Sequence, residues 1–258
     1  MKGVIRIATR LSFPEYPPMP LPTYTLTCTR NEAIANDVHV FMFTKPEGFV
    51  FTPGQFVLFQ IPLIDSPADI QTRAFSIASA PDEPELLFVA KFVSGGRASR
   101  WIKEVLQPGD TIAMQGPFGN FLLDHATPKD YLFIATGTGI APFRPQILSL
   151  LSGGGDHHHR IDLIFGVRTE ADLFWTDDFT KLTQQHENFY LHVILNEPSA
   201  AWTGHRGRVQ VLTEKLITDS SHRSVYVCGN PDMTKDIKRL CLDVWHLPKE
   251  DVHVEGYI

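Results

Sequence analysis

Residues 131–143 read YLFIATGTGIAPF, an apolar run that ends in two closely spaced glycines and a proline. A continuous apolar run that leads through glycine into a helical pattern is typical of a buried parallel strand. Apolar strand-like runs alternate with helical patterns up to the end of the chain. Residues 126–258 are therefore predicted to form an α/β domain whose parallel sheet is covered on both faces. The expected strands are YLFIATG, IDLIFGV, FYLHVIL, SVYVCG and DVHVEGYI, and the expected helices span about 142–151, 171–184, 209–217 and 231–246.

Residues 23–125 show a different pattern, with short β-rich runs separated by proline and glycine. Regular short strands with such turn residues predict an antiparallel β-barrel or sandwich, interrupted here by one helix near 98–106. Residues 1–22 are rich in proline and are expected to be an extended N-terminal arm. The β-rich runs are YTLTCT, DVHVFMFT, QFVLFQIP, RAFSIAS, ELLFVAKFV and DTIAMQGP.

The composition is that of an ordinary globular protein. The 258 residues include 23 Lys and Arg against 29 Asp and Glu, which gives a net charge of −6 at pH 7. This balance argues against a general attraction to nucleic acid or to an anionic membrane. The sequence shows neither an apolar run long enough to span a bilayer nor a signal-peptide core, so a cytoplasmic protein is expected.

The three cysteines, Cys28, Cys228 and Cys241, include no Cys-x-x-Cys pair. This excludes a disulfide framework, and three thiolates are too few for an iron–sulfur cluster held by four. Cys228 begins the sequence Cys-Gly-Asn-Pro after an expected strand. Ligands collect at the carboxyl ends of parallel strands, but a lone cysteine there is more often a packing residue.

The glycine turn after the strand at 131–136 is the first candidate ligand site. Gly137-Thr138-Gly139 lets the backbone approach a ligand, and the helix that follows presents free N–H groups to phosphate. The spacing is not the Gly-x-Gly-x-x-Gly fingerprint, because position 142 is proline, and no Gly-Lys-Ser/Thr follows. From these residues alone, a phosphate site and a merely tight turn both remain open.

The second candidate is Arg73-Ala74-Phe75-Ser76 in the β-rich half. An arginine fork suits a pyrophosphate, an aromatic ring suits a flat ligand, and a hydroxyl can bond a ring nitrogen. Strand alternation places Arg73 and Phe75 on one face and Ser76 on the other. An edge strand with an exposed arginine is therefore the competing interpretation.

In this order, the motifs resemble those of the ferredoxin–NADP reductase superfamily, over nearly the whole chain from about Thr23. Three further segments are similar to that family: 96–99 (GRAS) to its second flavin-phosphate turn, 116–119 (GPFG) to the turn that closes its flavin barrel, and 255–258 (EGYI) to its C-terminal Glu-x-Tyr. The resemblance implies an FAD-binding β-barrel over 23–125 and an NAD(P)-binding α/β domain over 126–258, without an iron–sulfur domain.

The resemblance also implies roles for individual residues. Arg73, Phe75 and Ser76 would hold the flavin, while Ser76, Cys228, Glu255 and Tyr257 would surround the path of the hydride, with Tyr257 stacked on the flavin. The cofactor-binding set implied in this way is Arg73, Ala74, Phe75, Ser76, Ala90, Lys91, Gly96, Arg97, Ala98, Ser99, Gly137, Thr138, Gly139, Arg168, Gly229, Asn230, Pro231, Met233 and Tyr257.

The activity implied is hydride transfer from NAD(P)H to bound FAD, followed by release of single electrons to a separate ferredoxin, flavodoxin or oxygenase component. The enzyme is expected to be a monomer. One alternative is a reductase that releases reduced free flavin, and an alternative of another class is an electron-transfer subunit that acts only within a larger complex. The Glu255-x-Tyr257 ending favours a retained FAD.

NADH is favoured over NADPH as the co-substrate. Members that prefer NADPH have a Ser-Arg pair after the third strand of this domain, whereas here Asn196-Glu197-Pro198 follows, and Glu197 would repel a 2′-phosphate. The segment 202–207 (WTGHRG) is similar to the loop of reductases that use NADH. Arg168 is the residue that would allow NADPH through a bidentate contact.

Two charged segments have competing interpretations. Lys91, Arg97, Arg100 and Lys103 form either a dock for an acidic electron carrier or an ordinary solvated face. The histidines at 157–159 follow three glycines, and such a loop is a poor metal site, so no metal is expected.

Overall fold

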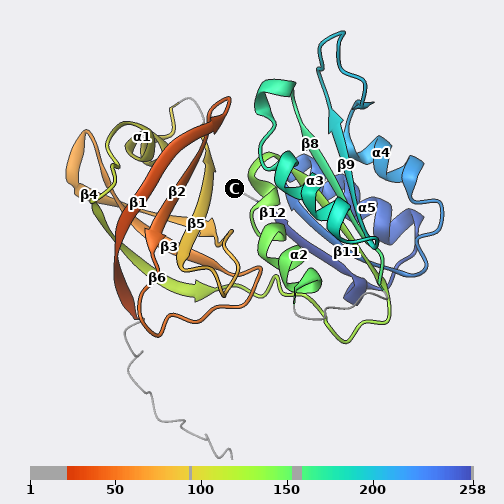
Figure 1. Cartoon of the computed structure of the whole chain (residues 1–258), viewed down its shortest axis with the longest axis horizontal. Helices are drawn as coiled ribbons and strands as arrows, with labels where there is room; N and C mark the ends of the chain where they lie inside the picture. The colour runs from red at the N-terminus through yellow and green to blue at the C-terminus, as the bar shows by residue number, and fades with distance from the viewer. Residues whose placement is uncertain (1–21, 93–94, 153–158, 257–258) are drawn as a thin grey trace, which may run out of the picture.

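A computed structural model describes residues 22–92, 95–152 and 159–256, and these form two six-stranded sheets that face each other (Figure 1). The expected fold class, an antiparallel β domain plus a parallel α/β domain, is confirmed. The proline-rich arm over 1–21, the first two histidines of the 157–159 run and Tyr257 lie outside the described residues.

The first sheet is antiparallel, with the strand order β4-β3-β6-β1-β2-β5. Alternate residues point inward, as in β3, whose buried and half-buried positions alternate along all eight residues. Phe41, Phe43, Phe59 and Phe88 fill the interior, with ring centroids 4.9–6.2 Å apart. The elements are β1 (Thr23–Ala35), β2 (Val38–Thr44), β3 (Phe56–Leu63), β4 (Ser66–Ser76), β5 (Glu85–Lys91), α1 (Arg97–Glu104) and β6 (Thr111–Phe118).

Strand β4 differs from the prediction, which placed a strand over RAFSIAS from residue 73. It begins at Ser66 and pairs with β3 along almost its whole length. Residues 66–70 and 72–74 are exposed, so this part of the strand carries no buried alternation that the sequence pattern could reveal. Since β4 lies at the edge of the sheet, one side of the strand has no neighbouring strand.

The second sheet is parallel, with the order β10-β9-β8-β7-β11-β12. Its central strands are buried almost throughout, which is why they are continuous apolar runs in the sequence. The elements are β7 (Asp130–Thr136), η1 (Gly137–Ile140), α2 (Phe143–Leu151), β8 (Ile161–Val167), η2 (Glu170–Asp172), α3 (Thr176–Gln185), β9 (Phe189–Leu195), β10 (His205–Arg206), α4 (Val209–Leu216), β11 (Arg223–Gly229), α5 (Pro231–Arg239), η3 (Leu240–Val244), η4 (Lys249–Asp251) and β12 (Val252–Gly256).

Two predicted helices are divided in the structure. The helix expected over 171–184 is a short 3₁₀ turn, η2, followed by α3, and Trp175 between them has a positive φ of 57°. The helix expected over 231–246 ends as α5 at Arg239 and continues as one π-helical turn. Among the described helices, none is long and apolar enough to span a bilayer.

The two sheets share one apolar core. Val38, Val40, Ala78 and Val89 from the antiparallel half belong to the same buried cluster as Phe143, Phe165 and Phe174 from the parallel half. Arg144 on α2 adds directional contacts, since it donates two hydrogen bonds of 2.7 Å to Glu83 and one of 2.9 Å to the Ala78 carbonyl. The shared core and these bonds fix the orientation of one sheet against the other.

A buried carboxylate, Asp162, joins three strands of the parallel sheet. It is 1% exposed, and it accepts hydrogen bonds from Arg160 at 2.7 and 3.0 Å and from Arg223 at 2.8 Å. The His192 Nε2 atom lies 2.9 Å from its other side. Burial alone would raise the pKa of Asp162, but these bonds and charges outweigh burial and hold the pKa far below its ordinary value.

Replacing Asp162 by asparagine should lower the free energy of unfolding by about 3 kcal/mol at pH 7, because it leaves Arg223, which is mostly buried, and the half-exposed Arg160 without their counter-charge. A carboxyl with a lowered native pKa contributes stability above its unfolded pKa, 3.8, and loses it as the pH falls below that value. The difference between the variant and the wild type should therefore shrink by about 1 kcal/mol between pH 7 and pH 3.

Urea unfolding at both pH values measures these differences. Asp178→Asn is the matched control, because Asp178 forms only an exposed ion pair with Lys181. A loss in Asp162→Asn no larger than in the control would show that the buried network contributes no net stability.

Candidate active site

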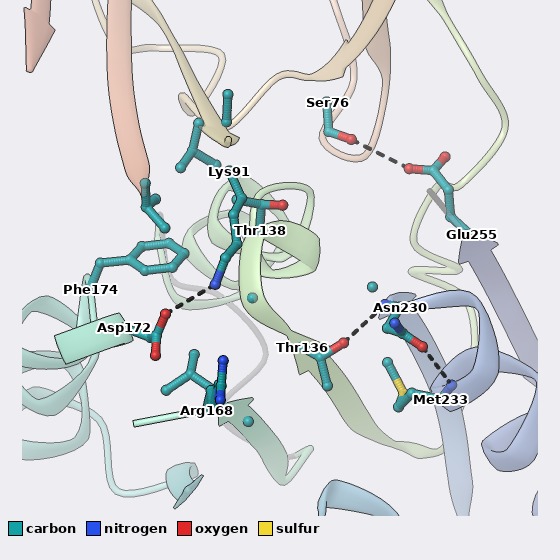
Figure 2. Close-up of a pocket in the computed structure, with 18 of the residues that line it drawn as sticks. Ser76, Lys91, Thr136, Thr138, Arg168, Asp172, Phe174, Asn230, Met233 and Glu255 are labelled. Atoms are coloured by element: carbon teal, nitrogen blue, oxygen red, sulfur yellow. Dashed lines mark hydrogen bonds and ion pairs between the residues drawn. The ribbon is translucent and has the colours of Figure 1, made fainter. Parts of the chain in front are cut away.

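A cavity of about 1220 Å³ lies between the two sheets and is lined by residues of both (Figure 2). Most of the residues implied by the resemblance line it. Gly139, Cys228 and Pro231 are not among its lining residues, and Tyr257 lies outside the described residues. The expected residues that line the cavity are Arg73, Ala74, Phe75, Ser76, Ala90, Lys91, Gly96, Arg97, Ala98, Ser99, Gly137, Thr138, Arg168, Gly229, Asn230, Met233 and Glu255.

The end of β4 forms one wall. Strand alternation predicts that Arg73 and Phe75 turn away from Ser76, yet all three line the cavity, because Ser76 is the last residue of the strand. The Phe75 ring packs against the barrel core, with its centroid 5.3 Å from that of Phe41. Arg73 is exposed and donates to the neighbouring Thr72 carbonyl at 3.0 Å. The wall thus presents a guanidinium and a hydroxyl above an aromatic base.

The start of α1 forms the second part of this wall. The helix begins after Gly96, no side chain caps its first N–H groups, and its first turn holds no acidic residue. The Ser99 hydroxyl donates to the Gly96 carbonyl at 3.0 Å, which fixes the turn. An uncapped helix start with an arginine and a serine in its first turn suits an anionic group.

The opposite wall is the glycine turn after β7. Gly137 has a φ of +53°, and a side chain at that position would meet open space, so the backbone is free to receive a ligand. Gly139 has another role, since a Cβ there would lie 2.3 Å from the Cys228 carbonyl oxygen. Gly139 therefore lets η1 lie directly against the end of β11, while Gly137 and Thr138 line the cavity.

The turn after β11 is held by Thr136. Its hydroxyl oxygen accepts a 3.0 Å hydrogen bond from the Asn230 N–H, and the Asn230 side chain accepts from the backbone N–H groups of Asp232 and Met233 at the start of α5 (Figure 2). Cys228 precedes this turn with 0% of its surface exposed, packed in the shared core. Its side chain is thus part of the cavity's support, and Gly229 and Asn230 form the lining there.

Ser76 and Glu255 meet although 179 residues separate them. The Ser76 hydroxyl lies 3.4 Å from Glu255 Oε1, at the junction of β4 with β12 (Figure 2). Burial raises the pKa of Glu255, and the bond from Ser76 only partly opposes this effect. The pair therefore places a carboxyl group whose protonation is favoured beside a hydroxyl, an arrangement that can hold or move a proton.

The far end of the cavity contains Arg168, which the resemblance implied, together with residues that the sequence analysis did not include in the cofactor-binding set. Arg168 lines it and forms a 2.9 Å ion pair with Glu197. Asn196, Gly207, Arg208 and Gln210 also line it, and the glycine and basic residue directly before α4 are the signal that could have identified this region. Among the described residues, Arg208 forms no ion pair.

The basic cluster proposed as a dock is matched by acidic residues. Lys91 pairs with Asp172 at 3.0 Å, and Arg97 with Asp69 at 3.4 Å. Arg100 and Lys103 lie within 3.1–3.7 Å of Glu104, Asp65 and Asp37. With each cation facing a carboxylate, this face holds no excess positive charge that would attract an acidic carrier, and the solvated-face interpretation is favoured. In the described ranges, no group of three potential metal ligands occurs.

The residues present fit two phosphate-bearing cofactors. One wall offers Arg73 and the open start of α1, and the other offers the Gly137 turn with open space in front of its backbone. Both open onto one cavity, whose volume suits large ligands.

Comparison with known proteins matches both halves of the chain. Residues 25–122 match the oxidoreductase FAD-binding domain and residues 133–239 the oxidoreductase NAD-binding domain. Ferredoxin–NADP reductase B of Sorangium cellulosum is 33% identical over 224 residues, which cover 83% of this chain and 89% of the relative.

Two further proteins extend the comparison. The electron transfer component of toluate 1,2-dioxygenase from Pseudomonas putida is 30% identical over 73% of this chain, and the match covers only 54% of that protein. The crystal structure of a ferredoxin NADP⁺ reductase from Neisseria gonorrhoeae with bound FAD and NADP has a TM-score of 0.77, 22% identity and coverage of 91% of this chain and 98% of its own.

These matches agree with the geometry of the cavity, in which one wall comes from each of the matched domains. The chain therefore belongs to the ferredoxin–NADP reductase family of FAD-dependent NAD(P)H oxidoreductases.

Proposed function

We propose that this protein oxidises NADH, transfers the hydride to tightly held FAD, and passes single electrons to a separate acceptor protein. The observation that carries the proposal is the single cavity to which the two matched domains each contribute one anion-receiving wall. A flavin bound there would convert a two-electron donor into a source of single electrons.

The proposed division of labour follows the two walls. Arg73, the start of α1 and Ser76 hold FAD, and the Gly137–Thr138 turn receives the pyrophosphate of the nicotinamide nucleotide. Ser76 and Glu255 hold a proton close to the reacting rings. Thr136 positions the Gly229–Asn230 turn that supports the nicotinamide, while Cys228 acts from beneath through packing.

The preference for NADH rests on the Arg168–Glu197 ion pair. Glu197 neutralises Arg168, the nearest arginine after β8, and adds a negative charge where a 2′-phosphate would lie. The backbone supports this arrangement, because the Glu197 N–H donates to the Arg168 carbonyl at 2.7 Å. Arg208, which lines the same end of the cavity, would then contact the phosphates that both nucleotides share.

The acceptor is proposed to be an oxygenase component or a ferredoxin-type carrier. The relative from Pseudomonas putida is an electron transfer component of a dioxygenase, and the relative from Sorangium cellulosum is a ferredoxin–NADP reductase. Because this chain spans about half the length of the dioxygenase component, its acceptor remains a proposal. We further propose that the FAD-binding domain spans residues 23–125 and the NAD(P)-binding domain residues 126–258. The protein is proposed to be a monomer and to be cytoplasmic.

Rapid anaerobic mixing of the purified yellow protein with NADH and with NADPH tests the proposal. We expect bleaching of the bound-flavin absorbance by both nucleotides, about tenfold more efficiently with NADH, because Glu197 opposes a 2′-phosphate. A flavin that separates from the protein on gel filtration before or after reduction would favour the free-flavin reductase instead.

Replacing Arg73 by alanine should weaken FAD binding by about 2 kcal/mol, roughly thirtyfold, because a pyrophosphate loses a charge-assisted hydrogen bond. Fluorescence titration of the flavin-depleted protein measures the affinity. Arg30→Ala is the matched control, since Arg30 is an exposed arginine that pairs with Glu32 outside the cavity. Equal affinities in the two variants would show that Arg73 is only a surface residue of β4.

Replacing Glu197 by glutamine should raise kcat/KM for NADPH relative to NADH by about tenfold, because Arg168 becomes available to a 2′-phosphate. The double variant Glu197→Gln, Arg168→Met should lose this gain. Glu187→Gln, the same charge change at an exposed position away from the cavity, is the control. An unchanged ratio in Glu197→Gln would place the 2′ position elsewhere.

A further inference from the structure

The 3₁₀ turn η2, residues Glu170–Asp172, contacts three different segments through three consecutive residues. Asp172 accepts a 3.0 Å hydrogen bond from Lys91 of β5, and the Ala171 carbonyl accepts a 2.7 Å bond from the Asn36 N–H between β1 and β2. Glu170 points the other way and accepts bonds from Ser199. The turn therefore lies between the antiparallel half, which is proposed to hold FAD and is called the flavin half below, and the loop 196–206.

Asp172 contacts the flavin half through a buried carboxylate, whereas its partner Lys91 is partly exposed. Asp172 is 3% exposed, and besides the bond from Lys91 (Figure 2) it accepts a 2.7 Å hydrogen bond from the Thr169 hydroxyl and a 3.1 Å bond from the Thr169 N–H. The bond from the Thr169 N–H is one half of a capping box, in which the Thr169 side chain also accepts from the Asp172 backbone. Lys91 itself lines the cavity. One carboxylate thus fixes the geometry of η2 and ties it to the wall proposed to hold FAD.

Glu170 holds the loop 196–206 by accepting hydrogen bonds from Ser199. Its Oε1 atom accepts from the Ser199 hydroxyl at 2.7 Å and from the Ser199 N–H at 2.9 Å. Arg206 then donates from the end of the loop back to the carbonyls of Ser199 and Trp202, at 3.0 and 2.5 Å. Asn196, the first residue of the loop, and Gly207, the residue directly after it, line the cavity.

The position of this loop identifies the part of the ligand that it serves. Nicotinamide must reach the flavin wall, so the adenosine end of the dinucleotide extends along the carboxyl ends of the strands toward β9 and β10. The loop 196–206 begins directly after β9 and includes β10. Because these contacts order the loop before a ligand binds, less conformational entropy is lost when the ligand binds.

We propose that Glu170 and Asp172 are positioning residues through which η2 anchors the loop 196–206 to the flavin half, in the conformation that receives the adenosine-diphosphate part of the nucleotide. This inference rests on the proposed function, because it assumes that a dinucleotide binds in this cavity. It adds that the affinity for the adenosine end depends on Glu170, which does not line the cavity, and on Asp172, which lines it beside Lys91.

ADP-ribose, which lacks nicotinamide, is the probe, and its Kd is measured by calorimetry on the FAD-loaded full chain. Glu170→Ala should raise this Kd and the KM for NADH about tenfold, because Ser199 loses a charged acceptor. The rate of flavin reduction at saturating NADH should stay within about twofold, since the reacting rings are untouched. Glu170→Gln keeps an acceptor oxygen for Ser199 and should restore most of the affinity.

Asp172→Asn tests the anchor, because it removes the charge that holds Lys91 while keeping the shape of the side chain. Alone it should raise the Kd for ADP-ribose about threefold, and combined with Glu170→Ala it should add almost nothing, because both act through the same loop. Asp178→Ala, a carboxylate on α3 with only an exposed partner, should leave every value unchanged.

The outcomes separate the two proposals. A wild-type protein that binds no ADP-ribose or does not reduce its flavin with NADH overturns the proposed function. A working wild type with an unchanged Kd in Glu170→Ala overturns this inference alone. Fully additive effects of the two substitutions, or a parallel fall in reduction rate and affinity, also overturn it, since they indicate a general loss of structure.

Discussion

The shared apolar core between the two sheets is the constraint on which the rest of the structure depends. Val38 and Val89 are buried against the aromatic side chains of the parallel half, so neither sheet has a free inner face at this junction. Apolar burial is strong but has no preferred direction, so it holds the halves together without fixing their angle. The Arg144–Glu83 bonds and the contacts of η2 supply that direction, and the cavity keeps its shape because both kinds of interaction act at its border.

Backbone crowding at the centre of the parallel sheet determines where the ligand can lie. The strand order reverses at β7. The chain leaves the neighbouring strands β7 and β11 in opposite directions, which opens a crevice between the turns that follow them. Gly139 and Gly229 bring these turns into contact with Cys228 and Thr136, and neither position has space for a Cβ. The two glycines of the motif at 137–139 thus have separate roles. Gly137 leaves space for a ligand, and Gly139 allows the turn to pack against the end of β11.

Much of the fold was predictable because its strands are either fully buried or alternately buried. The apolar run at 131–136 forms β7 as predicted. The two motifs of the β-rich half at 73–76 and 96–99 line the cavity. The first part of β4 was not predictable, because exposed edge residues show no periodicity. The pairing of Lys91 with Asp172 and of Ser76 with Glu255 was also beyond the sequence, since each pair spans more than 80 residues and no local pattern encodes it. The resemblance to a family identified Ser76 and Glu255 together, but it placed Cys228 at a surface that the structure gives to Gly229 and Asn230.

The ion pairs divide the cations that line the cavity into two groups. Lys91, Arg97 and Arg168 line the cavity and each already faces a carboxylate. Among the described residues, the cavity-lining arginines that form no ion pair are Arg73 on the antiparallel sheet and Arg208 beside the parallel sheet. Each stands on its own wall together with an open helix start or a glycine turn. The protein carries a net charge of −6, yet each wall of the cavity presents one arginine that no ion pair among the described residues neutralises, and the paired cations link the segments that build the two walls.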